Sequence, residues 1–504
     1  MRWRPVLLIW GLTSLLSVLW SFATPIGAAP DEPAHFIRAA AVARGEFLGT
    51  PSNIGTVVHV PAYVGFTQAV TCFAFQAEVT ADCSPTETTD PATIVKAATT
   101  AGLYNPVYYA LVGWPSLLFH DQSGLYAMRV LSGILSCLFL ALAGAQLLAL
   151  RRRAIPLLAF LVAVTPMVLF LGSTLNPNAL EVTATLSTFV TMFLVVRHPD
   201  PALLPARAIT VLVSASVAVT MRGLSPLWVV MALFLPLLLA RREELRPLIR
   251  SRWAQLAALV IGVAGVFAVV WILVTNSLGP NFSTNVDQAP GLGDSPLQGF
   301  LFILFGTFGY AQGLVGVFGW LDTPAPLAVF FTWSALIGLP LLLAVALLRG
   351  RARALLLTLL VAIVLLPPAL QAIYIHGGGI IWQGRYALPV YVCLVMALGL
   401  LLAEVLPPLE PRVARTLVIT IAAAWGFCQV YSFGTALRRY SVGLTGNLTG
   451  MLHPTWNPPG GILPLTAVFT IVCGVGVVLL IRRALAPSSS ALERDDEVVG
   501  RAHR

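Results

Sequence analysis

Residues 5–38 read PVLLIWGLTSLLSVLWSFATPIGAAPDEPAHFIR, an apolar run that ends abruptly in a polar segment. The run 5–22 is long enough to cross the roughly 30 Å hydrocarbon core of a membrane as one helix. Arg2 and Arg4 precede it, and positive charge favours the cytoplasmic side. Residues 1–28 could instead be a signal peptide cleaved after an alanine-rich site. The length of the run and the polar segment that follows favour a retained first span, which leaves the membrane on the outer side.

The composition places the rest of the chain in the membrane class as well. Of the 504 residues, 58% are hydrophobic and only 10% are charged, whereas soluble domains carry about 25% charged residues. The net charge of +9 comes mainly from arginines beside apolar blocks. Such clusters mark cytoplasmic loops and not a nucleic-acid surface. We therefore expect an all-α integral membrane protein that has lipid, and no nucleic acid, as a partner.

Eleven further apolar blocks predict spans, which makes about twelve in all. They cover residues 124–150, 154–173, 178–196, 208–221, 223–240, 255–275, 325–348, 354–374, 386–403, 414–434 and 462–481. This threading puts most arginine clusters and both termini in the cytoplasm, as expected for a multipass protein of the cytoplasmic membrane. The pair 208–221 and 223–240 is drawn as a thin hairpin with Arg222 near the outer face.

The threading predicts one transmembrane domain, residues 1–483, and a disordered cytoplasmic tail, 484–504. The outer loops are at about 23–123, 276–324, 375–385 and 435–461. Within the first loop, 103–119 (LYNPVYYALVGWPSLLF) is expected to be a juxtamembrane helix, because a further span would invert every later loop. Cys72 and Cys83 lie in the same loop, where an oxidising compartment would favour a disulfide between them.

The polar segment after the first span carries the first candidate catalytic residues. Pro30 and the carboxylates of Asp31 and Glu32 are typical of a helix N-terminus. On a helix over 31–44, Asp31, His35 and Arg38 share one face at the membrane surface. The alternative is an N-capping carboxylate with solvated polar neighbours.

Basic residues near the outer ends of spans form a second group of candidates. Arg385 precedes Tyr386, and its planar fork suits a phosphate; otherwise the two residues are an interfacial anchor. His376, beside a run of glycines, could join Arg385 or be incidental. Arg222 is costly near membrane depth, so it could pair with Glu181 or line a donor site.

Aromatic residues alternate with glycines in GVFGWLDTP at 316–324. Trp320 in this motif suits stacking on a sugar ring, or docking on the membrane surface. Asp322 is a weaker candidate for contact with a substrate.

Together these motifs resemble the GT-C glycosyltransferases, multipass enzymes that take a sugar from a polyprenyl-phosphate donor. The resemblance rests on Asp31-Glu32 with His35, on Asn105-Pro106-Val107-Tyr108-Tyr109, and on Arg129 in the second span. The chain resembles more closely an uncharacterised bacterial multipass family grouped with that superfamily. The stretches that carry this likeness are PDEPAH at 30–35, NPNAL at 176–180, GVFGWLDTP at 316–324 and QGRYALP at 383–389.

The resemblance implies an inverting transferase with a GT-C-like fold, which acts on the outer face of the cytoplasmic membrane in cell-envelope glycan assembly. Its partners would be a polyprenyl-phosphate-linked sugar and a glycan or protein acceptor. Asp31 would be the base, with Glu32 and His35 as supports, although Glu32 could take that role instead. Arg385 would stabilise the leaving phosphate. Further substrate contacts are expected from Arg38, Arg222, Tyr386, His376, Trp320, Asp322, Asn176, Asn178 and Glu181.

The sequence departs from the family pattern at two positions. Asn178 stands where relatives often have an acidic residue, and Val107 replaces a second proline. No cofactor is therefore implied with certainty, and a divalent cation stays open as an alternative.

Two other functions also stay open. A transporter or flippase of a lipid-linked glycan would be expected to show inverted repeats and ionisable residues near the midplane. Here no repeat is detectable, and the polar residues gather at the outer ends of the predicted spans. A non-catalytic membrane scaffold is the third function, and the ordered acidic and basic residues at the outer face argue against it.

Overall fold

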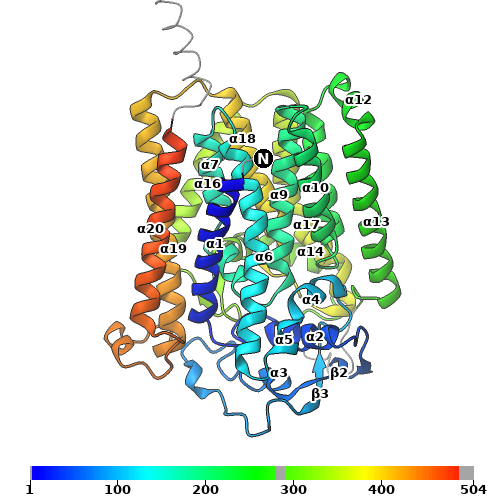
Figure 1. The fold of residues 1–504 in the computed structure, drawn as a ribbon, viewed down its shortest axis with the longest axis vertical. Helices are drawn as coiled ribbons and strands as arrows, with labels where there is room; N and C mark the ends of the chain where they lie inside the picture. The colour runs from blue at the N-terminus through cyan, green and yellow to red at the C-terminus, as the bar shows by residue number, and fades with distance from the viewer. Residues whose placement is uncertain (1–2, 280–289, 487–504) are drawn as a thin grey trace, which may run out of the picture.

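The computed structural model describes residues 3–279 and 290–486. Nine helices in these residues are long and apolar enough to cross a membrane, or up to eleven if each of two bent pairs is one span. The nine are α1 (Trp3–Ala23), α6 (Gln122–Leu148), α9 (Pro177–Arg197), α13 (Arg252–Thr275), α16 (Leu327–Leu347), α17 (Gly350–Gly378), α18 (Leu388–Val405), α19 (Pro411–Val442) and α20 (Ile462–Leu485). The chain is therefore mostly helical and multipass in character, and the long helices run side by side in Figure 1.

The first bent pair is α7 (Ala154–Ala163) and α8 (Pro166–Gly172), which meet at 60°. Pro166 cannot donate a backbone hydrogen bond, so the predicted straight span over 154–173 breaks here. The side chain of Thr165 accepts a hydrogen bond from the Val168 N–H and caps the new helix. A break of this kind in an apolar run is not visible from hydropathy alone.

The second bent pair, α14 (Pro296–Phe305) and α15 (Thr307–Val315), also meets at 60°. The sequence predicts a loop with an apolar stretch here, and the structure corrects it to two helices. Before the pair, the Pro290 carbonyl accepts from Ile380 N at 2.7 Å. After it, Trp320 Nε1 donates to the Gly27 carbonyl at 2.8 Å. By length and composition the pair is either one broken span or a re-entrant hairpin.

Two shorter apolar helices occupy the region of the predicted thin hairpin. They are α10 (Leu204–Val219) and α11 (Ser225–Phe234), the latter continued by η3 (Leu235–Leu239). The turn between them carries Arg222. The short helix α12 (Arg242–Arg250) follows, at the upper end of the molecule in Figure 1.

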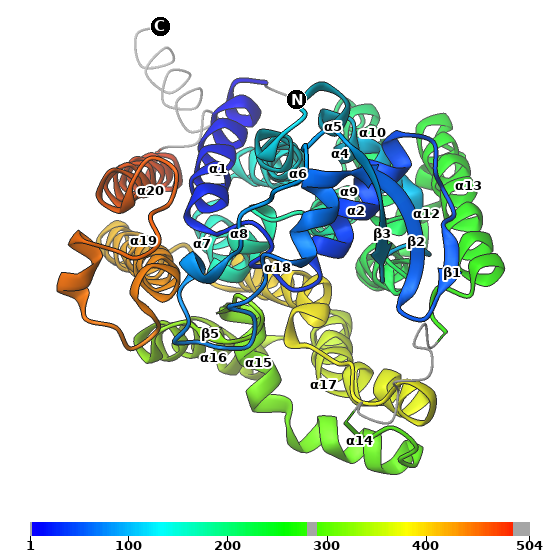
Figure 2. The same ribbon diagram turned by 90° about the horizontal axis from the view of Figure 1, so that it is seen from below.

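A small layer covers the lower end of the bundle in Figure 1, and we call this end the loop face. Its elements are α2 (Glu32–Ala43), α3 (Ala62–Gly65), α4 (Pro106–Gly113), α5 (Pro115–Leu118), β1 (Thr50–Ser52), β2 (Gly55–Pro61) and β3 (Ile94–Thr99). The three strands form an antiparallel sheet in the order β1-β2-β3, with Thr56 opposite Thr99. Figure 2 shows the strands and α2 lying across the ends of the long helices. The sheet was not predicted, and the expected helix over 103–119 is two short helices.

The remaining elements are short. They are η1 (Phe66–Gln68), η2 (Ala81–Cys83), β4 (Val317–Phe318), β5 (Thr323–Pro324), η5 (Gly384–Ala387) and η6 (Leu448–Leu452). Several predicted boundaries shift, for example at 375–378, which were expected in a loop and end α17. Residues 435–442, expected in a loop, extend α19, and residues 484–485, expected in the tail, end α20. The rest of the predicted tail, 487–504, lies outside the described residues.

The centre of the bundle is formed by α9 and α18, since 89% of the apolar window of each is buried. At the other extreme, only 11% of the α13 window is buried. The first helix packs closely on its neighbours: Ser17 Oγ donates to the Gly172 carbonyl at 2.9 Å, and a Cβ at Gly133 would lie 2.4 Å from that oxygen atom of Ser17. Small residues of this kind let membrane helices approach closely.

Candidate functional site

A cavity of about 670 Å³ lies where the loop-face layer meets the ends of α10, α11, α13 and α17. Five of the predicted site residues line it: Asp31, His35, Glu181, Arg222 and Tyr386. Apolar and aromatic side chains form much of the remaining wall, among them Trp228, Trp271, Ile272, Leu370, Ile373, Tyr374, Ile380 and Trp382. Segments far apart in the sequence therefore bring a polar end and an apolar wall into one cavity.

Asp31 occupies the N-cap position of α2, but its side chain makes no capping hydrogen bond. Its backbone has φ 64°, a conformation that is uncommon for residues other than glycine. The side chain is 47% exposed, and Oδ2 accepts one hydrogen bond from Arg385 Nη2 at 3.0 Å. The carboxylate is therefore turned from the helix towards the cavity, with lone pairs that a ligand could use.

The charges around Asp31 determine its protonation and that of His35. Burial alone would raise the pKa of Asp31, but Arg385, His35 and Arg222 outweigh this and lower it below 3.8. Burial lowers the pKa of His35 to about 3, against the attraction of Asp31 and helped by both arginines. At neutral pH the carboxylate is ionised and the imidazole is neutral. His35 Nδ1 lies 2.8 Å from Tyr109 Oη.

Two guanidinium groups flank the ring of Tyr386. The Cζ atom of Arg222 lies 4.4 Å from the ring centroid, and that of Arg385 lies 5.2 Å from it. Arg222 forms no ion pair within 4 Å in the described part of the chain, so the predicted contact with Glu181 is not direct. Ser225 lies between them: its hydroxyl donates to Glu181 Oε1 at 2.6 Å and accepts from the Arg222 backbone N–H at 2.8 Å.

Arg385 lies behind Asp31 and is not part of the cavity wall. Its Nε donates to Gln383 Oε1 at 2.7 Å and its Nη2 to Asp31, while the buried Nη1 has no hydrogen-bond partner. The QGRY motif needs a glycine at position 384, because a Cβ there would lie 1.9 Å from the Tyr310 carbonyl oxygen of α15. The close contact between η5 and α15 therefore requires glycine and sets the position of Arg385.

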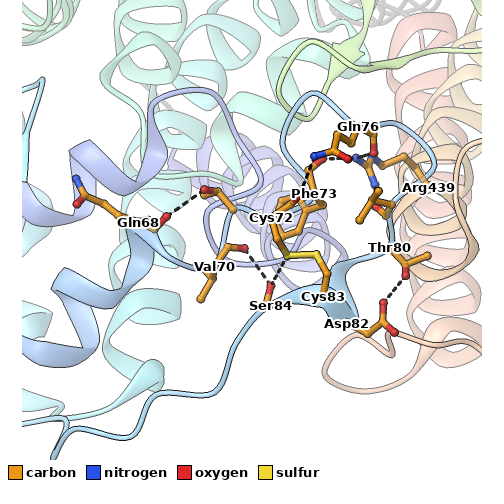
Figure 3. The surroundings of a disulfide bond; sticks show 12 residues. Gln68, Val70, Cys72, Phe73, Gln76, Thr80, Asp82, Cys83, Ser84 and Arg439 are labelled. Atoms are coloured by element: carbon orange, nitrogen blue, oxygen red, sulfur yellow. Dashed lines mark hydrogen bonds between the residues drawn. A yellow bond between two sulfur atoms is a disulfide. The ribbon is translucent and has the colours of Figure 1, made fainter. Parts of the chain in front are cut away.

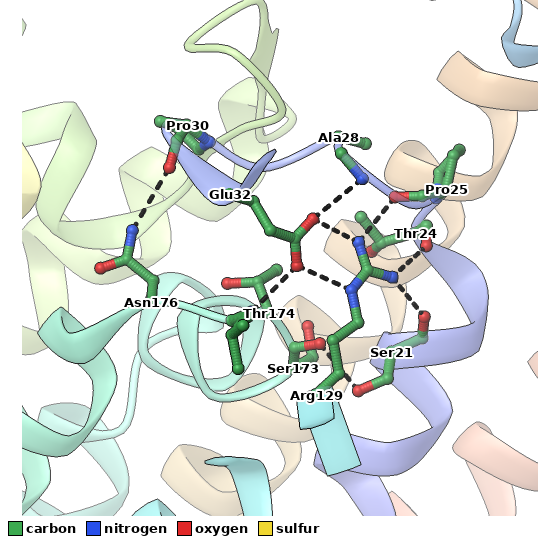
Figure 4. A network of polar contacts seen from close by, with 12 residues as sticks. Ser21, Thr24, Pro25, Ala28, Pro30, Glu32, Arg129, Ser173, Thr174 and Asn176 are labelled. Atoms are coloured by element: carbon green, nitrogen blue, oxygen red, sulfur yellow. Dashed lines mark hydrogen bonds and ion pairs between the residues drawn. The ribbon is translucent and has the colours of Figure 1, made fainter. Parts of the chain in front are cut away.

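Glu32 points away from the cavity into a closed network, shown in Figure 4. Its carboxylate accepts from Arg129 Nε at 2.7 Å and Nη2 at 2.5 Å, and from two backbone N–H groups, of Gly27 and Leu175. The other Arg129 donors bind carbonyls near the end of α1, those of Ser21, Thr24 and Pro25. Both side chains are fully buried. The pair joins α1, α2, α6 and the turn before α9.

The NPNAL motif caps α9 and supports the cavity from behind. Asn176 Oδ1 accepts from the Asn178 N–H at 3.0 Å, and its Nδ2 donates to the Pro30 carbonyl at 3.3 Å. Asn178 Nδ2 donates to Glu181 Oε2 at 2.9 Å. Both asparagines are buried and neither lines the cavity. Their contacts nevertheless fix residues next to Asp31 and the carboxylate of Glu181.

Four other predicted contact residues also lie outside the cavity wall. Arg38 donates to the carbonyls of Phe47 and Tyr104, at 2.7 and 2.9 Å. His376 is exposed at the end of α17, and Trp320 donates to the Gly27 carbonyl. Asp322 forms an ion pair with Arg439 at 3.1 Å. Spacing along a helix grouped Arg38 with Asp31 and His35 on one face, but in the structure only Asp31 and His35 line the cavity, because the Arg38 side chain is bound to two backbone carbonyls.

Arg439 is the centre of a second buried network, shown in Figure 3. Cys72 and Cys83 form a disulfide with their Cα atoms 6.1 Å apart. Within the loop that they close, the carbonyls of Phe73 and Gln76 each accept from Arg439 Nη2 at 2.8 Å, and that of Val79 accepts from Nη1 at 2.5 Å. Arg439 and Asp322 thus attach this loop and the GVFGWLDTP segment to the end of α19.

Apart from Tyr386, sequence reasoning did not identify the aromatic residues of the cavity wall. Tyr104, Trp228, Trp271, Tyr374 and Trp382 all line it. Their positions near the ends of apolar blocks are typical of an aromatic belt, so they carried no separate signal. Only the arrangement of the helices shows that they face one space.

In residues 3–279 and 290–486 no three His, Cys, Asp or Glu side chains gather where they could hold a metal ion. A family model described as predicted membrane protein (DUF2142) matches residues 14–394. The match covers more than half of the chain, so the protein belongs to this family. No curated protein matches the chain.

Proposed function

We propose that this member of the DUF2142 family of predicted membrane proteins is an inverting glycosyltransferase that uses a polyprenyl-phosphate sugar donor. The acceptor is a hydroxyl group of a glycan or protein on the outer face of the cytoplasmic membrane, in cell-envelope glycan assembly. The proposal starts from the resemblance to the GT-C enzymes, and resemblance in fold alone does not establish function. The observation that carries it is one cavity with an ionised carboxylate and a guanidinium at one end and an apolar wall at the other.

The apolar wall supports a ligand with a lipid tail. Trp271 and Ile272 come from α13, which is the least buried of the nine long helices in the described residues. Ile373 comes from α17, and its side chain is 83% exposed although it lines the cavity. Exposed apolar residues on membrane helices face lipid. We therefore propose that the polyprenyl chain lies along α13 and α17, with its phosphate towards Arg222.

Asp31 is the proposed general base. Its carboxylate accepts the proton of the acceptor hydroxyl while that oxygen attacks the anomeric carbon of the sugar. The bond between the anomeric carbon and the phosphate oxygen breaks, and polyprenyl phosphate leaves with the electron pair. Base and leaving group then lie on opposite faces of the sugar ring, as inversion requires. Since the pKa of Asp31 is lowered, the base is ready in its ionised form at neutral pH.

Arg222 and Arg385 are proposed to stabilise the negative charge that grows on the phosphate. Groups placed to meet developing charge lower the barrier to reaction. Arg222 lines the cavity and forms no ion pair in the described residues, so it is the first contact of the phosphate. Arg385 stands behind Asp31 and contributes its unpaired Nη1. Glu32 is proposed to stabilise the fold through its ion pair with Arg129 and to take no part in the reaction.

The proposal includes a topology of about twelve spans with both termini in the cytoplasm. Twelve spans result if α10, α11 with η3, and the bent pair α7–α8 each cross the membrane and α14–α15 does not. The end opposite the loop face carries arginines such as Arg152, Arg197 and Arg351, whose contacts with Leu406, Glu404 and Ala240 lie at the ends of spans. Positive charge at that end supports its assignment to the cytoplasm.

The test is sugar transfer by purified protein in liposomes, with a panel of radiolabelled polyprenyl-phosphate sugars and extracts of envelope glycans as acceptors. Wild type and the control Asp322→Asn should transfer one of these sugars. Asp31→Asn should bind the donor but transfer it at least about a hundredfold more slowly, which is the usual contribution of a general base. Equal product from correctly inserted Asp31→Asn would contradict the proposal. Movement of labelled lipid-linked glycan across the bilayer, without transfer, would support a flippase instead.

A further inference from the structure

Three arginines form ion pairs with carboxylates near the loop face, and they differ in how completely their donors are used. Every N–H group of the Arg129 side chain donates a hydrogen bond, either to the Glu32 carboxylate or to one of three backbone carbonyls. Arg439 binds Asp322 and three carbonyls of the disulfide loop, and its buried Nε has no partner among the described residues. Among residues 3–279 and 290–486, Arg385 binds only the side chains of Gln383 and Asp31, and its Nη1 has no partner although the side chain is just 1% exposed. A buried donor without a partner is costly, and Arg385 differs from Arg439 because the carboxylate that it binds, Asp31, lines the cavity, from which a ligand can approach.

Asp31 is held to Arg385 by a single hydrogen bond. Its side chain makes no capping bond to α2, and its left-handed backbone turns it from the helix N–H groups. Nearly half of the side chain is exposed to the cavity. The carboxylate can therefore rotate away from Arg385 without disturbing the start of the helix.

Arg385, in contrast, is fixed. Gln383 holds its Nε at 2.7 Å, and Gly384 packs against the backbone of α15 with no room for a Cβ. Its guanidinium group remains in place whichever anion binds the outer donors. Arg222 also lies against the Tyr386 ring and lines the cavity, so a second positive charge is available to an anion that arrives from the cavity.

We propose that the phosphate group of a lipid ligand competes with the Asp31 carboxylate for Arg385, so that binding of the ligand releases Asp31 into the cavity. The inference rests on the proposed function only in taking a lipid phosphate as the ligand. The order of events follows from it. The donor binds first, and the carboxylate becomes free to accept a proton only when the leaving group is in place. Gln383 is a positioning residue, because it holds Arg385 in both states.

The test measures binding without any sugar transfer. Dodecyl phosphate is titrated into the purified full-length protein in a neutral maltoside detergent, and binding is followed by the fluorescence of the tryptophans in the cavity wall, Trp228, Trp271 and Trp382. Asp31→Asn should bind dodecyl phosphate about five- to tenfold more tightly, since a neutral amide competes less well for a guanidinium than a carboxylate does. Arg385→Gln should bind it at least about tenfold more weakly. Asp322→Asn is the matched control and should leave the affinity unchanged, because neither Asp322 nor its partner Arg439 lines the cavity.

A double-mutant cycle separates competition from simple repulsion between anions. If Asp31 and the phosphate compete for Arg385, Asp31→Asn should tighten binding in the wild-type background and give no gain in the Arg385→Gln background. An equal gain in both backgrounds, or no gain in either, would overturn the inference. Size-exclusion chromatography of each variant checks that it is folded.

The same binding titration is repeated with inorganic phosphate in place of dodecyl phosphate. Weak binding of inorganic phosphate beside tight binding of dodecyl phosphate is expected for a lipid ligand. The same affinity for both would contradict the lipid part of the inference and identify free phosphate as the ligand. Since no reaction is measured, a failure of sugar transfer and a failure of this competition are distinguishable.

Discussion

Asp31 and Glu32 are adjacent carboxylates with opposite surroundings. Glu32 is fully buried and accepts hydrogen bonds from Arg129 and two backbone N–H groups. Asp31 is 47% exposed and accepts one hydrogen bond, from Arg385. The left-handed backbone at Asp31 turns its side chain away from the helix that begins at Glu32, so Glu32 faces the bundle and Asp31 the cavity. The difference shows how one short motif can supply both a structural ion pair and a group free to bind substrate.

Removal of the Glu32 carboxylate should have the largest effect on stability. Glu32→Ala leaves Arg129 charged and buried without its partner, which typically costs about 3–5 kcal/mol. The measurement is thermal unfolding of the purified protein in detergent, compared with wild type. Unchanged unfolding would mean that the Glu32–Arg129 network does not hold the loop-face layer on the bundle.

Removal of the Asp322 carboxylate should have an intermediate effect on stability, between those of Glu32 and Asp31. Its partner Arg439 is fully buried, but three carbonyls of the disulfide loop also accept from that guanidinium. Asp322→Ala should therefore destabilise the protein by about 1–3 kcal/mol, less than Glu32→Ala, because Arg439 keeps other partners. The same unfolding assay checks the ranking. A loss greater than that of Glu32→Ala would show that burial of the pair does not determine its contribution.

His35 allows the cavity to be tested by pH. The unfolded chain takes up a proton on this imidazole below about pH 6.5, whereas the folded protein, with a His35 pKa of about 3, does not. Stability should therefore fall as the pH drops from 6.5 towards 3, by up to about 1.4 kcal/mol per pH unit. Unfolding of wild type and His35→Gln is compared at pH 7 and pH 5. His35→Gln should lose this part of the pH dependence, and His120→Gln, at an exposed site, should keep it. Identical slopes for all three proteins would exclude a neutral, buried His35.

The sequence was most informative where local rules apply. Long apolar runs such as 462–481 and the arginines beside them predicted the helices α20 and its neighbours. The polar segment at 30–35 supplied Asp31 and His35, both of which line the cavity. These signals are contained in a few consecutive residues, and they need no knowledge of what packs against them.

Other features depend on contacts between distant segments and could not be predicted. Asp31 and Glu32 are equivalent in the sequence, and only the approach of Arg129 and Arg385 from separate helices distinguishes them. Arg439 was expected in a loop, because the polar end of α19 lacks the apolar pattern of a span. The short strand β2 pairs with β3 across an intervening loop of more than thirty residues, so neither showed a hairpin signal.

Asp31→Asn should have the smallest effect on stability, although its effect on transfer is large. The Asp31 side chain is 47% exposed, and the amide oxygen of asparagine can still accept a hydrogen bond from the buried Arg385, so we expect a loss of only about 1 kcal/mol. The temperature at which Asp31→Asn unfolds should therefore lie close to that of wild type. A loss as large as that of Glu32→Ala would mean that Asp31, too, is a structural residue.

The most direct test of the account compares Asp31→Asn with Glu32→Gln in one experiment, with sugar transfer measured per folded molecule beside thermal unfolding. We predict that Asp31→Asn unfolds like wild type and transfers sugar at least about a hundredfold more slowly, as expected after loss of a general base. Glu32→Gln should unfold at a lower temperature, while its folded fraction transfers sugar within about tenfold of the wild-type rate, because Glu32 contacts no substrate. The reverse pattern, with transfer lost in folded Glu32→Gln and kept in Asp31→Asn, would contradict the separation of roles between the two carboxylates.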